Sequence, residues 1–271
     1  MTLIRTKLGN FNFWYKKGDK TIGERISLRK FERFETYLMK NLSRGVGIAV
    51  DVGANIGYYT LILSKLTDSV VSYEPERESR KMLIKNVVEN GIRNVKIIGK
   101  AVSNRKELLR LGVSEDNLGD HQINPKTNHR RIEVVKSTYL DADISERVSI
   151  LKIDTQGWEP KVIIGSKKLI SRYQPTIFME FWPEGYKRSS LNYSKMISFL
   201  ERKYRNIYLI DDYLEMVYPI KAETLETRCR TRKGYVDLLF KKNMNFSDRW
   251  LCIKSFRIKR FIKKMFRLEI N

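Results

Sequence analysis

The sequence is poor in the residues that stabilise folds through disulfides or metals. It contains two cysteines, Cys229 and Cys252, and two histidines, His121 and His129, among 271 residues. Two thiols do not make a disulfide framework, and no Cys/His cluster has the spacing of a zinc site. We therefore expect a reduced, cytoplasmic protein without a metal site.

Long apolar runs are also missing. No segment approaches the roughly 18 uninterrupted apolar residues of a membrane span, and the N-terminal segment MTLIRTKLGNFNFWYKKGDK has no apolar core of signal-peptide length. We expect a protein that is either dissolved in the cytoplasm or peripherally attached to a membrane surface.

Positive charge, in contrast, is in large excess. There are 53 Lys+Arg against 31 Asp+Glu, a formal net charge of +22. Such an excess points to an anionic partner, which is nucleic acid, membrane phosphate or an acidic substrate. The hydrophobic fraction of 42% is sufficient for a full core.

Hydrophobic periodicity predicts an alternation of strands and helices. Strands are expected at 46–51, 69–74, 95–99, 131–140, 148–153, 176–181, 207–210 and 235–240, and helices at 25–40, 57–66, 76–90, 159–170 and 194–203. This order predicts an α/β fold with a mostly parallel, doubly wound sheet. The polar stretch 112–130 is expected to be a binding loop or lid. We divide the chain into an N-terminal extension with a helix (1–44), a main domain (45–242) and a C-terminal helix (247–271).

A glycine-rich turn follows the first strand of the main domain, in the stretch IAVDVGANIGYYT at 48–60. No GxxxxGK[ST] string occurs in the sequence, and Tyr58 stands where a GxGxxG motif requires its third glycine. A turn at 53–55 with a helix starting near Gly57 would present unpaired N–H groups, which suit a carboxylate as well as a phosphate. This spacing favours S-adenosylmethionine (SAM) over NAD. The expected contacts are Asp51, Gly53, Ala54, Asn55, Gly57 and Tyr58.

The next predicted strand ends in Glu74, and Pro75 follows it. A carboxylate about 20 residues beyond the turn is placed to accept both ribose hydroxyls of a bound nucleoside. An ordinary glycine turn beside an exposed glutamate is the simpler alternative.

Four blocks in this order, AVDVGANIGYYT, YEPE, LKIDTQGWEPKVIIGSKKLI and PTIFMEF, resemble the FkbM-type family of SAM-dependent methyltransferases. The resemblance covers about 46–180. It implies a class I Rossmann-like fold with an antiparallel last strand, for which 235–240 is the candidate, and SAM as cofactor. It also implies O-methylation of a hydroxyl in sugars or in lipid- and polyketide-linked acceptors. Ala101, Val102 and Ser103 match a short string of the family and are expected at the adenine. Position 156 is acidic in many members and is Gln here.

Three residues are candidates for catalysis. Asp154 ends a predicted strand beside the first one and would point toward the transferred methyl group as base or orienting group, unless it only caps the next helix. Glu159 falls in the first turn of that helix, where the helix dipole favours acids in any case. His121 lies in the loop 112–130 and would act only if the loop closes; solvent exposure is the alternative.

The C-terminal segment RWLCIKSFRIKRFIKKMFRL (249–268) holds eight Lys/Arg and no acidic residue. As a helix it has an apolar face with Trp and Phe and a basic face, a composition typical of interfacial membrane helices. Docking on its own domain and binding of nucleic acid stay open.

The leading hypothesis is a SAM-dependent O-methyltransferase acting on a saccharide or lipid-linked hydroxyl. An RNA methyltransferase and a non-catalytic membrane-surface protein are the alternatives, and nucleic acid is the less favoured partner because no RNA-binding module is recognisable.

Overall fold

The computed structural model describes residues 2–42, 47–114, 117, 119–125 and 131–244. The predicted helix at 247–271, including the basic segment 249–268, lies outside the described residues. None of the helices in the described part has the length and apolarity needed to cross a membrane.

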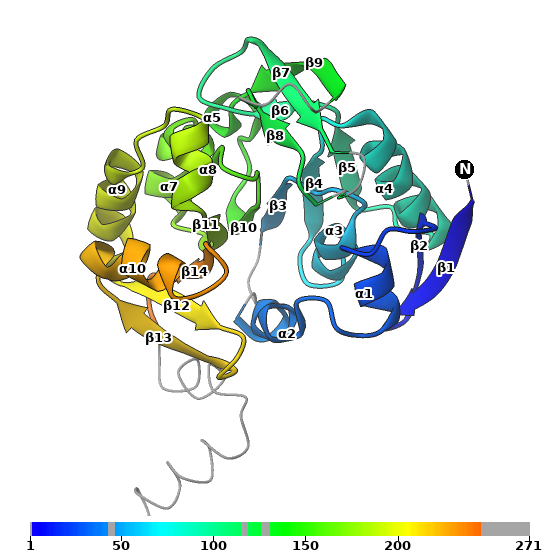
Figure 1. Cartoon of the computed structure of the whole chain (residues 1–271), viewed down its shortest axis with the longest axis horizontal. Coiled ribbons are helices and arrows are strands. Elements are labelled where there is room, and N and C mark those ends of the chain that lie inside the picture. Colours follow the sequence, from blue (N-terminus) through cyan, green and yellow to red (C-terminus); the bar gives the residue numbers. More distant parts are fainter. Residues whose placement is uncertain (1, 43–46, 115–116, 118, 126–130, 245–271) are drawn as a thin grey trace, which may run out of the picture.

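An eight-stranded sheet forms the centre of the molecule (Figure 1). Its order is β13-β12-β14-β11-β10-β3-β4-β5. The neighbours from β11 to β5 are parallel, whereas β14 is antiparallel to both β11 and β12. This confirms the predicted mostly parallel sheet with an antiparallel last strand, the class I Rossmann-like arrangement. The strands are β3 (Ile48–Val52), β4 (Ser69–Tyr73), β5 (Val95–Ile98), β10 (Val148–Ile153), β11 (Thr176–Phe181), β12 (Ile207–Asp211), β13 (Met216–Ile220) and β14 (Val236–Phe240).

Helices cover both faces of this sheet because its strands are buried on both sides. Successive residues of β3 and β10 alternate between two cores: Ala49 and Ile150 join one, Val50 and Leu151 the other. The first core is closed by α1 (Gly23–Ser27), α2 (Arg33–Leu42), α3 (Tyr58–Leu63) and α4 (Arg77–Glu89). The second is closed by α6 (Glu159–Ile164), α7 (Lys167–Tyr173), α9 (Ser194–Tyr204) and α10 (Leu225–Arg230). The short helices α5 (Leu140–Asp143) and α8 (Pro183–Arg188) lie in connections.

Two of the predicted helices are wrong as single elements. The segment 25–40 contains the end of α1 and most of α2, separated by a connection that includes Glu32 in a left-handed conformation (φ +36°). The segment 159–170 is divided between α6 and α7 at Gly165. A Cβ at Gly165 would lie 2.1 Å from the carbonyl oxygen of Ser103, so the chain is pressed against a neighbouring backbone where the first helix ends.

A second, four-stranded sheet was only partly predicted. Its order is β6-β9-β7-β8, with β6 (Ala101–Val102), β7 (Leu108–Val113), β8 (Gln122–Ile123) and β9 (Arg131–Thr138). Strands β7 and β8 therefore occupy parts of the expected loop 112–130. This sheet lies at the top of Figure 1, next to α4 and α5.

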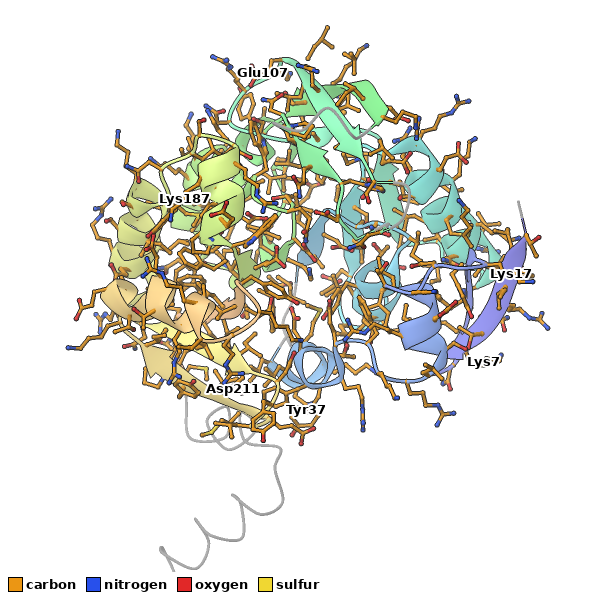
Figure 2. All side chains as sticks on the ribbon, viewed as in Figure 1. Lys7, Lys17, Tyr37, Glu107, Lys187 and Asp211 are labelled. Atoms are coloured by element: carbon orange, nitrogen blue, oxygen red, sulfur yellow. The ribbon has the colours of Figure 1, made fainter. Side chains whose placement is uncertain are left out.

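The N-terminal residues, which had no assignment beyond an extension, form a hairpin of β1 (Leu3–Leu8) and β2 (Phe11–Lys16). The hairpin docks on α4, where Asn90 Oδ1 accepts a hydrogen bond from the N–H of Asn12 (2.8 Å) and Asn86 Oδ1 accepts one from Trp14 (2.7 Å). Basic side chains project from the outer surface, as Lys7 and Lys17 show at the edge of Figure 2.

Candidate active site

The carboxyl ends of the parallel strands open into a cavity of about 950 Å³. Asp51 and Glu180 are the penultimate residues of β3 and β11, while Glu74 and Asp154 directly follow β4 and β10. All four carboxylates line the cavity, so the structure gathers an acidic rim at the ends of four neighbouring strands.

The glycine turn after β3 is shaped by packing within the protein. Gly53 and Gly57 have positive φ angles of +80° and +95°. A Cβ at Gly53 would lie 1.8 Å from the backbone oxygen of Asp154, and one at Gly57 would lie 2.5 Å from Leu83 Cδ1. The first glycine thus lets the turn touch the end of β10, which brings Asp154 beside the candidate cofactor turn.

The expectation that this turn and the start of its helix present unpaired N–H groups is wrong for all five amides from Gly53 to Gly57. Ile56 donates to Asn55 Oδ1 at 2.7 Å and Gly57 to the carbonyl oxygen of Ala54 at 2.9 Å. The N–H groups of Gly53 and Ala54 both donate to the carbonyl oxygen of Tyr73 at 3.0 Å, and Asn55 donates to Glu74 Oε2 at 2.8 Å. These bonds fasten the turn to the end of β4. Side chains and carbonyl groups are therefore the main contacts left for a ligand here.

Glu74 is the best-defined candidate for a ribose contact. Its side chain is buried, and besides Asn55 it accepts the N–H of Glu76 on Oε1 at 2.8 Å. Burial raises the pKa of Glu74 to about 7, although these N–H bonds act in the opposite direction. Each oxygen accepts only one of these bonds, which leaves acceptor capacity for ribose hydroxyls.

The remaining expected cofactor contacts divide into two groups. Pro75, Ala101 and Val102 line the cavity with Glu74, whereas Ser103 is fully buried and does not. Tyr58 lines the cavity, but its hydroxyl is hydrogen-bonded to Thr36 Oγ1 at 2.8 Å, and burial raises its pKa to about 12. Tyr58 therefore ties α2 to α3 over the site.

Asp154 is held by two side chains, and neither contact is a helix cap. Its Oδ2 lies 3.2 Å from Lys152 Nζ, and its Oδ1 accepts a hydrogen bond from Gln156 Nε2 at 2.9 Å. The same amide nitrogen donates to Glu180 Oε2 at 3.2 Å. Gln156 thus links the carboxylates at the ends of β10 and β11. Its backbone is in the left-handed region (φ +51°), which is strained for a glutamine and is a feature often found at functional sites.

Glu159 has a different environment. It is fully buried, does not line the cavity, and accepts hydrogen bonds from the N–H and Oγ1 of Thr155 (both 2.8 Å) and from the N–H of Gly157 (3.1 Å). Burial raises its pKa to about 7. These contacts describe a carboxylate that shapes the turn carrying Gln156.

His121 lines the cavity away from this turn, beside α4. Its Nδ1 accepts the N–H of Ser114 at 3.1 Å, and its Nε2 lies 3.5 Å from Ser79 Oγ. These contacts fix the imidazole at the small sheet and α4. His121 and Asp154 line the same cavity from different elements.

A buried lysine stands at the centre of the acidic side chains. Lys152 is 5% exposed, and its Nζ lies over the ring of Tyr59 at 4.8 Å from the centroid. Burial alone would lower the pKa of Lys152, but the charges of Asp154, Glu35 and Glu32 raise it above its ordinary value. Lys152 is the single charged residue of the otherwise mostly apolar strand β10, a pattern visible in the sequence, whereas Glu35 and Asp237 have no comparable pattern.

Residues 51–208 match the methyltransferase FkbM domain, which is more than half of the chain. The chain belongs to the FkbM methyltransferase family. Its cofactor is S-adenosylmethionine. No curated protein matches the sequence.

Solved structures resemble this FkbM chain at low identity. A methyltransferase FkbM from Methylobacillus flagellatus KT is 16% identical with a TM-score of 0.48, over 80% of this chain and 52% of that one. The chain therefore spans about half the length of that relative. A putative methyltransferase from Streptococcus mutans in complex with SAH is 11% identical (TM-score 0.43; 76% and 93% covered). An rRNA methylase from Streptococcus thermophilus is also 11% identical (TM-score 0.42; 82% and 99% covered).

The residues of the cavity fit S-adenosylmethionine. Glu74 offers acceptors to a ribose, and Ala101 and Val102 offer an apolar surface beside it. Asp51 lines the cavity beside the turn, and its Oδ2 accepts a hydrogen bond from Thr60 Oγ1 at 2.7 Å, so its carboxyl group is positioned where it would stabilise an amino group or a sulfonium. Within the described residues, no cluster of His, Cys, Asp or Glu is arranged to hold a metal ion.

Proposed function

We propose that this FkbM chain transfers a methyl group to a hydroxyl of a saccharide or lipid-linked acceptor. The observation that supports this most directly is the pair of carboxylates Asp154 and Glu180 at neighbouring strand ends, joined through Gln156. A hydroxyl is a poor nucleophile until a base takes its proton, and a carboxylate lining the cavity is suited to that task.

When bound, S-adenosylmethionine supplies a methyl group on a positively charged sulfur. Asp154 is proposed to orient the acceptor hydroxyl and take its proton, since its side chain is one-third exposed to the cavity (32%). Burial raises the pKa of Glu180 well above its ordinary range, and the nearby charges of Asp154 and Glu159 act in the same direction. Glu180 is thus suited to hold a proton and to donate a hydrogen bond to the acceptor.

The charge distribution in the cavity supports a neutral or cationic acceptor over RNA. Its inner wall carries Glu32, Glu35, Asp154, Glu180 and Asp237 against one buried cation, and these carboxylates repel phosphate. The exposed basic side chains lie at the opening. They are Lys20, Arg25, Lys30, Arg33, Arg188 and Lys233.

The opening also has apolar side chains that fit a lipid-linked acceptor. Leu28 is 63% exposed between the cavity-lining Arg25 and Lys30. Tyr213 and Leu214, 87% and 40% exposed, follow β12 next to the mouth. Exposed apolar residues among basic ones are typical of a surface that meets phospholipid or a lipid phosphate. Attachment through 249–268 is the second part of this proposal.

The test is methyl transfer from radiolabelled S-adenosylmethionine to a panel of neutral saccharides, amino sugars, lipid-linked saccharides and short RNAs. We expect label on a sugar hydroxyl, at least 100-fold slower in Asp154→Asn than in wild type, in the range of a lost general base. Glu223→Gln, which changes an exposed side chain (74% exposed) away from the cavity, is the matched control. Label that enters only RNA, or Asp154→Asn at wild-type rate, would refute the proposal.

A further inference from the structure

The inner wall of the cavity is an anionic chamber made of Glu32, Glu35, Glu180 and Asp237. Glu180 and Asp237 are direct cross-strand partners in the antiparallel pair β11–β14. Glu35, on α2, and Glu32, just before it, line the same cavity. Like charges directly opposite each other destabilise a sheet, so this arrangement carries a cost that the fold alone does not explain.

Three groups in this chamber have no hydrogen-bond partner among the described residues. Glu35 is 5% exposed and lines the cavity, and no hydrogen bond or ion pair joins its carboxyl group to a described residue. The hydroxyl of Tyr59, a residue 6% exposed, and Glu32 Oε2 are themselves buried without a hydrogen-bond partner, and burial and the charge of Glu32 raise the pKa of Tyr59. Burying such groups is unfavourable unless something binds them.

The protein's own cation does not satisfy this chamber. Lys152 Nζ is 3.2 Å from Asp154 Oδ2 and lies over the Tyr59 ring, and no ion pair within 4 Å joins it to Glu35 or Asp237 among the residues described. Burial and the charge of Glu32 raise the pKa of Asp237 to about 8, and burial and Asp237 raise the pKa of Glu35. A ligand that carries a positive charge would stabilise the ionised forms of these carboxyl groups, whereas a neutral polyol would not.

Helix α2, which carries Glu35, is held in place beside the chamber. Thr36 is hydrogen-bonded to Tyr58, and Phe31, just before α2, makes an edge-to-face contact with Tyr58, with ring centroids 4.8 Å apart. Glu32 holds a left-handed backbone conformation (φ +36°), which is strained for a glutamate. Such strain is typical of positions that are fixed for binding.

We propose that the acceptor carries a protonated amino group, which binds Glu35 and Asp237 while the hydroxyl to be methylated faces Asp154. An amino sugar has this combination of groups. This inference rests on the proposed O-methyltransferase function and names its substrate class.

Binding in the presence of saturating S-adenosylhomocysteine tests the amine separately from catalysis. Glucosamine, glucose and N-acetylglucosamine differ at one carbon, and only glucosamine is charged there. We expect glucosamine to bind at least about tenfold more tightly than either neutral sugar in calorimetry, the minimum for a charge-assisted hydrogen bond. Glu35→Gln and Asp237→Asn should each reduce that ratio, and Glu223→Gln should leave it unchanged.

A second measurement does not require a sugar to fit. Ethylammonium chloride should raise the thermal unfolding midpoint of the complex with S-adenosylhomocysteine above the midpoint in sodium chloride at equal ionic strength. The reason is that a ligand stabilises the state it binds. Glu35→Gln should remove the difference. Equal affinities for the three sugars would overturn the amine proposal, and so would a preference for glucosamine that survives both Glu35→Gln and Asp237→Asn. If no sugar binds, an equal unfolding midpoint in ethylammonium chloride and sodium chloride would overturn it. Failure of S-adenosylhomocysteine itself to bind would instead count against the methyltransferase proposal.

Discussion

Replacing Lys152 by methionine tests the electrostatics of the site most directly. Methionine keeps the length of the apolar stem and removes the only buried cation described among Asp51, Asp154, Glu32 and Glu35. Removing one partner of a buried ion pair costs about 3–5 kcal/mol, because the remaining charge is left uncompensated. We expect a loss of that size in the free energy of unfolding at pH 8.

The loss should shrink as the pH falls. The folded-state pKa values of Glu35, Asp51 and Asp237 already lie above their ordinary values through burial. These carboxyl groups therefore contribute their full stability at pH values below their pKa in the unfolded chain. That contribution declines as the pH rises through their pKa in the folded protein. Removing Lys152 takes away a charge that lowers these pKa values, so they rise further and the decline becomes steeper.

Urea unfolding of wild type and Lys152→Met at pH 5 and pH 8 measures this effect. Lys168→Met, which changes an exposed lysine of α7 outside the cavity, is the matched control and should cost less than about 0.5 kcal/mol. If Lys152→Met loses the same stability at both pH values, the loss is one of packing, and our description of a charged chamber is wrong.

Three further predictions concern the cofactor turn and its supports. Gly53→Ala should abolish S-adenosylhomocysteine binding and destabilise the fold, since its Cβ would lie 1.8 Å from a backbone oxygen. The control Gly18→Ala has a similar φ of +87° and no atom within 4 Å of the new Cβ. It should lower the free energy of unfolding, measured with urea, by only about 1–2 kcal/mol. Glu74→Gln should weaken S-adenosylhomocysteine about tenfold at pH 8. Because the pKa of Glu74 is about 7 and the ionised carboxylate is the better acceptor, wild-type affinity should rise as the pH increases through 7, and calorimetry should show a flatter profile for the variant. Glu159→Gln should lower the free energy of unfolding by about 1–3 kcal/mol, because it leaves a turn N–H without its acceptor; a large fall in turnover with unchanged stability would instead assign Glu159 to catalysis.

The central fold could be predicted from the sequence because its strands are short apolar runs with helical patterns between them. The strand predicted at 148–153 is found unchanged as Val148–Ile153, and the one at 176–181 as Thr176–Phe181. The hairpin β1–β2 was missed because its residues are basic and aromatic and only partly buried, so alternation is weak. The break between α6 and α7 was missed because it depends on contact of Gly165 with the distant backbone of Ser103.

The site was predictable only where it depends on local order along the chain. Asp51, Glu74 and Asp154 each stand at the end of a predicted strand, and such ends share one edge of a parallel sheet. Glu35 and Asp237 lie far from one another in sequence, in a helix and in a strand that both read as ordinary amphipathic elements. Both line the cavity, and Asp237 does so because β14 inserts antiparallel between β11 and β12, a topology that residue spacing does not encode.

The net charge of +22 and the acidic chamber are compatible because they act over different distances. Exposed lysines such as Lys7 and Lys187 stand in water, where charges more than about 10 Å apart are screened by salt. Inside the cavity, Glu35 and Asp237 would act on the proposed amino group with little screening. In our proposal the surface charge bears on what the protein approaches, and the chamber bears on which acceptor it binds. Total charge is therefore a poor argument for an RNA acceptor.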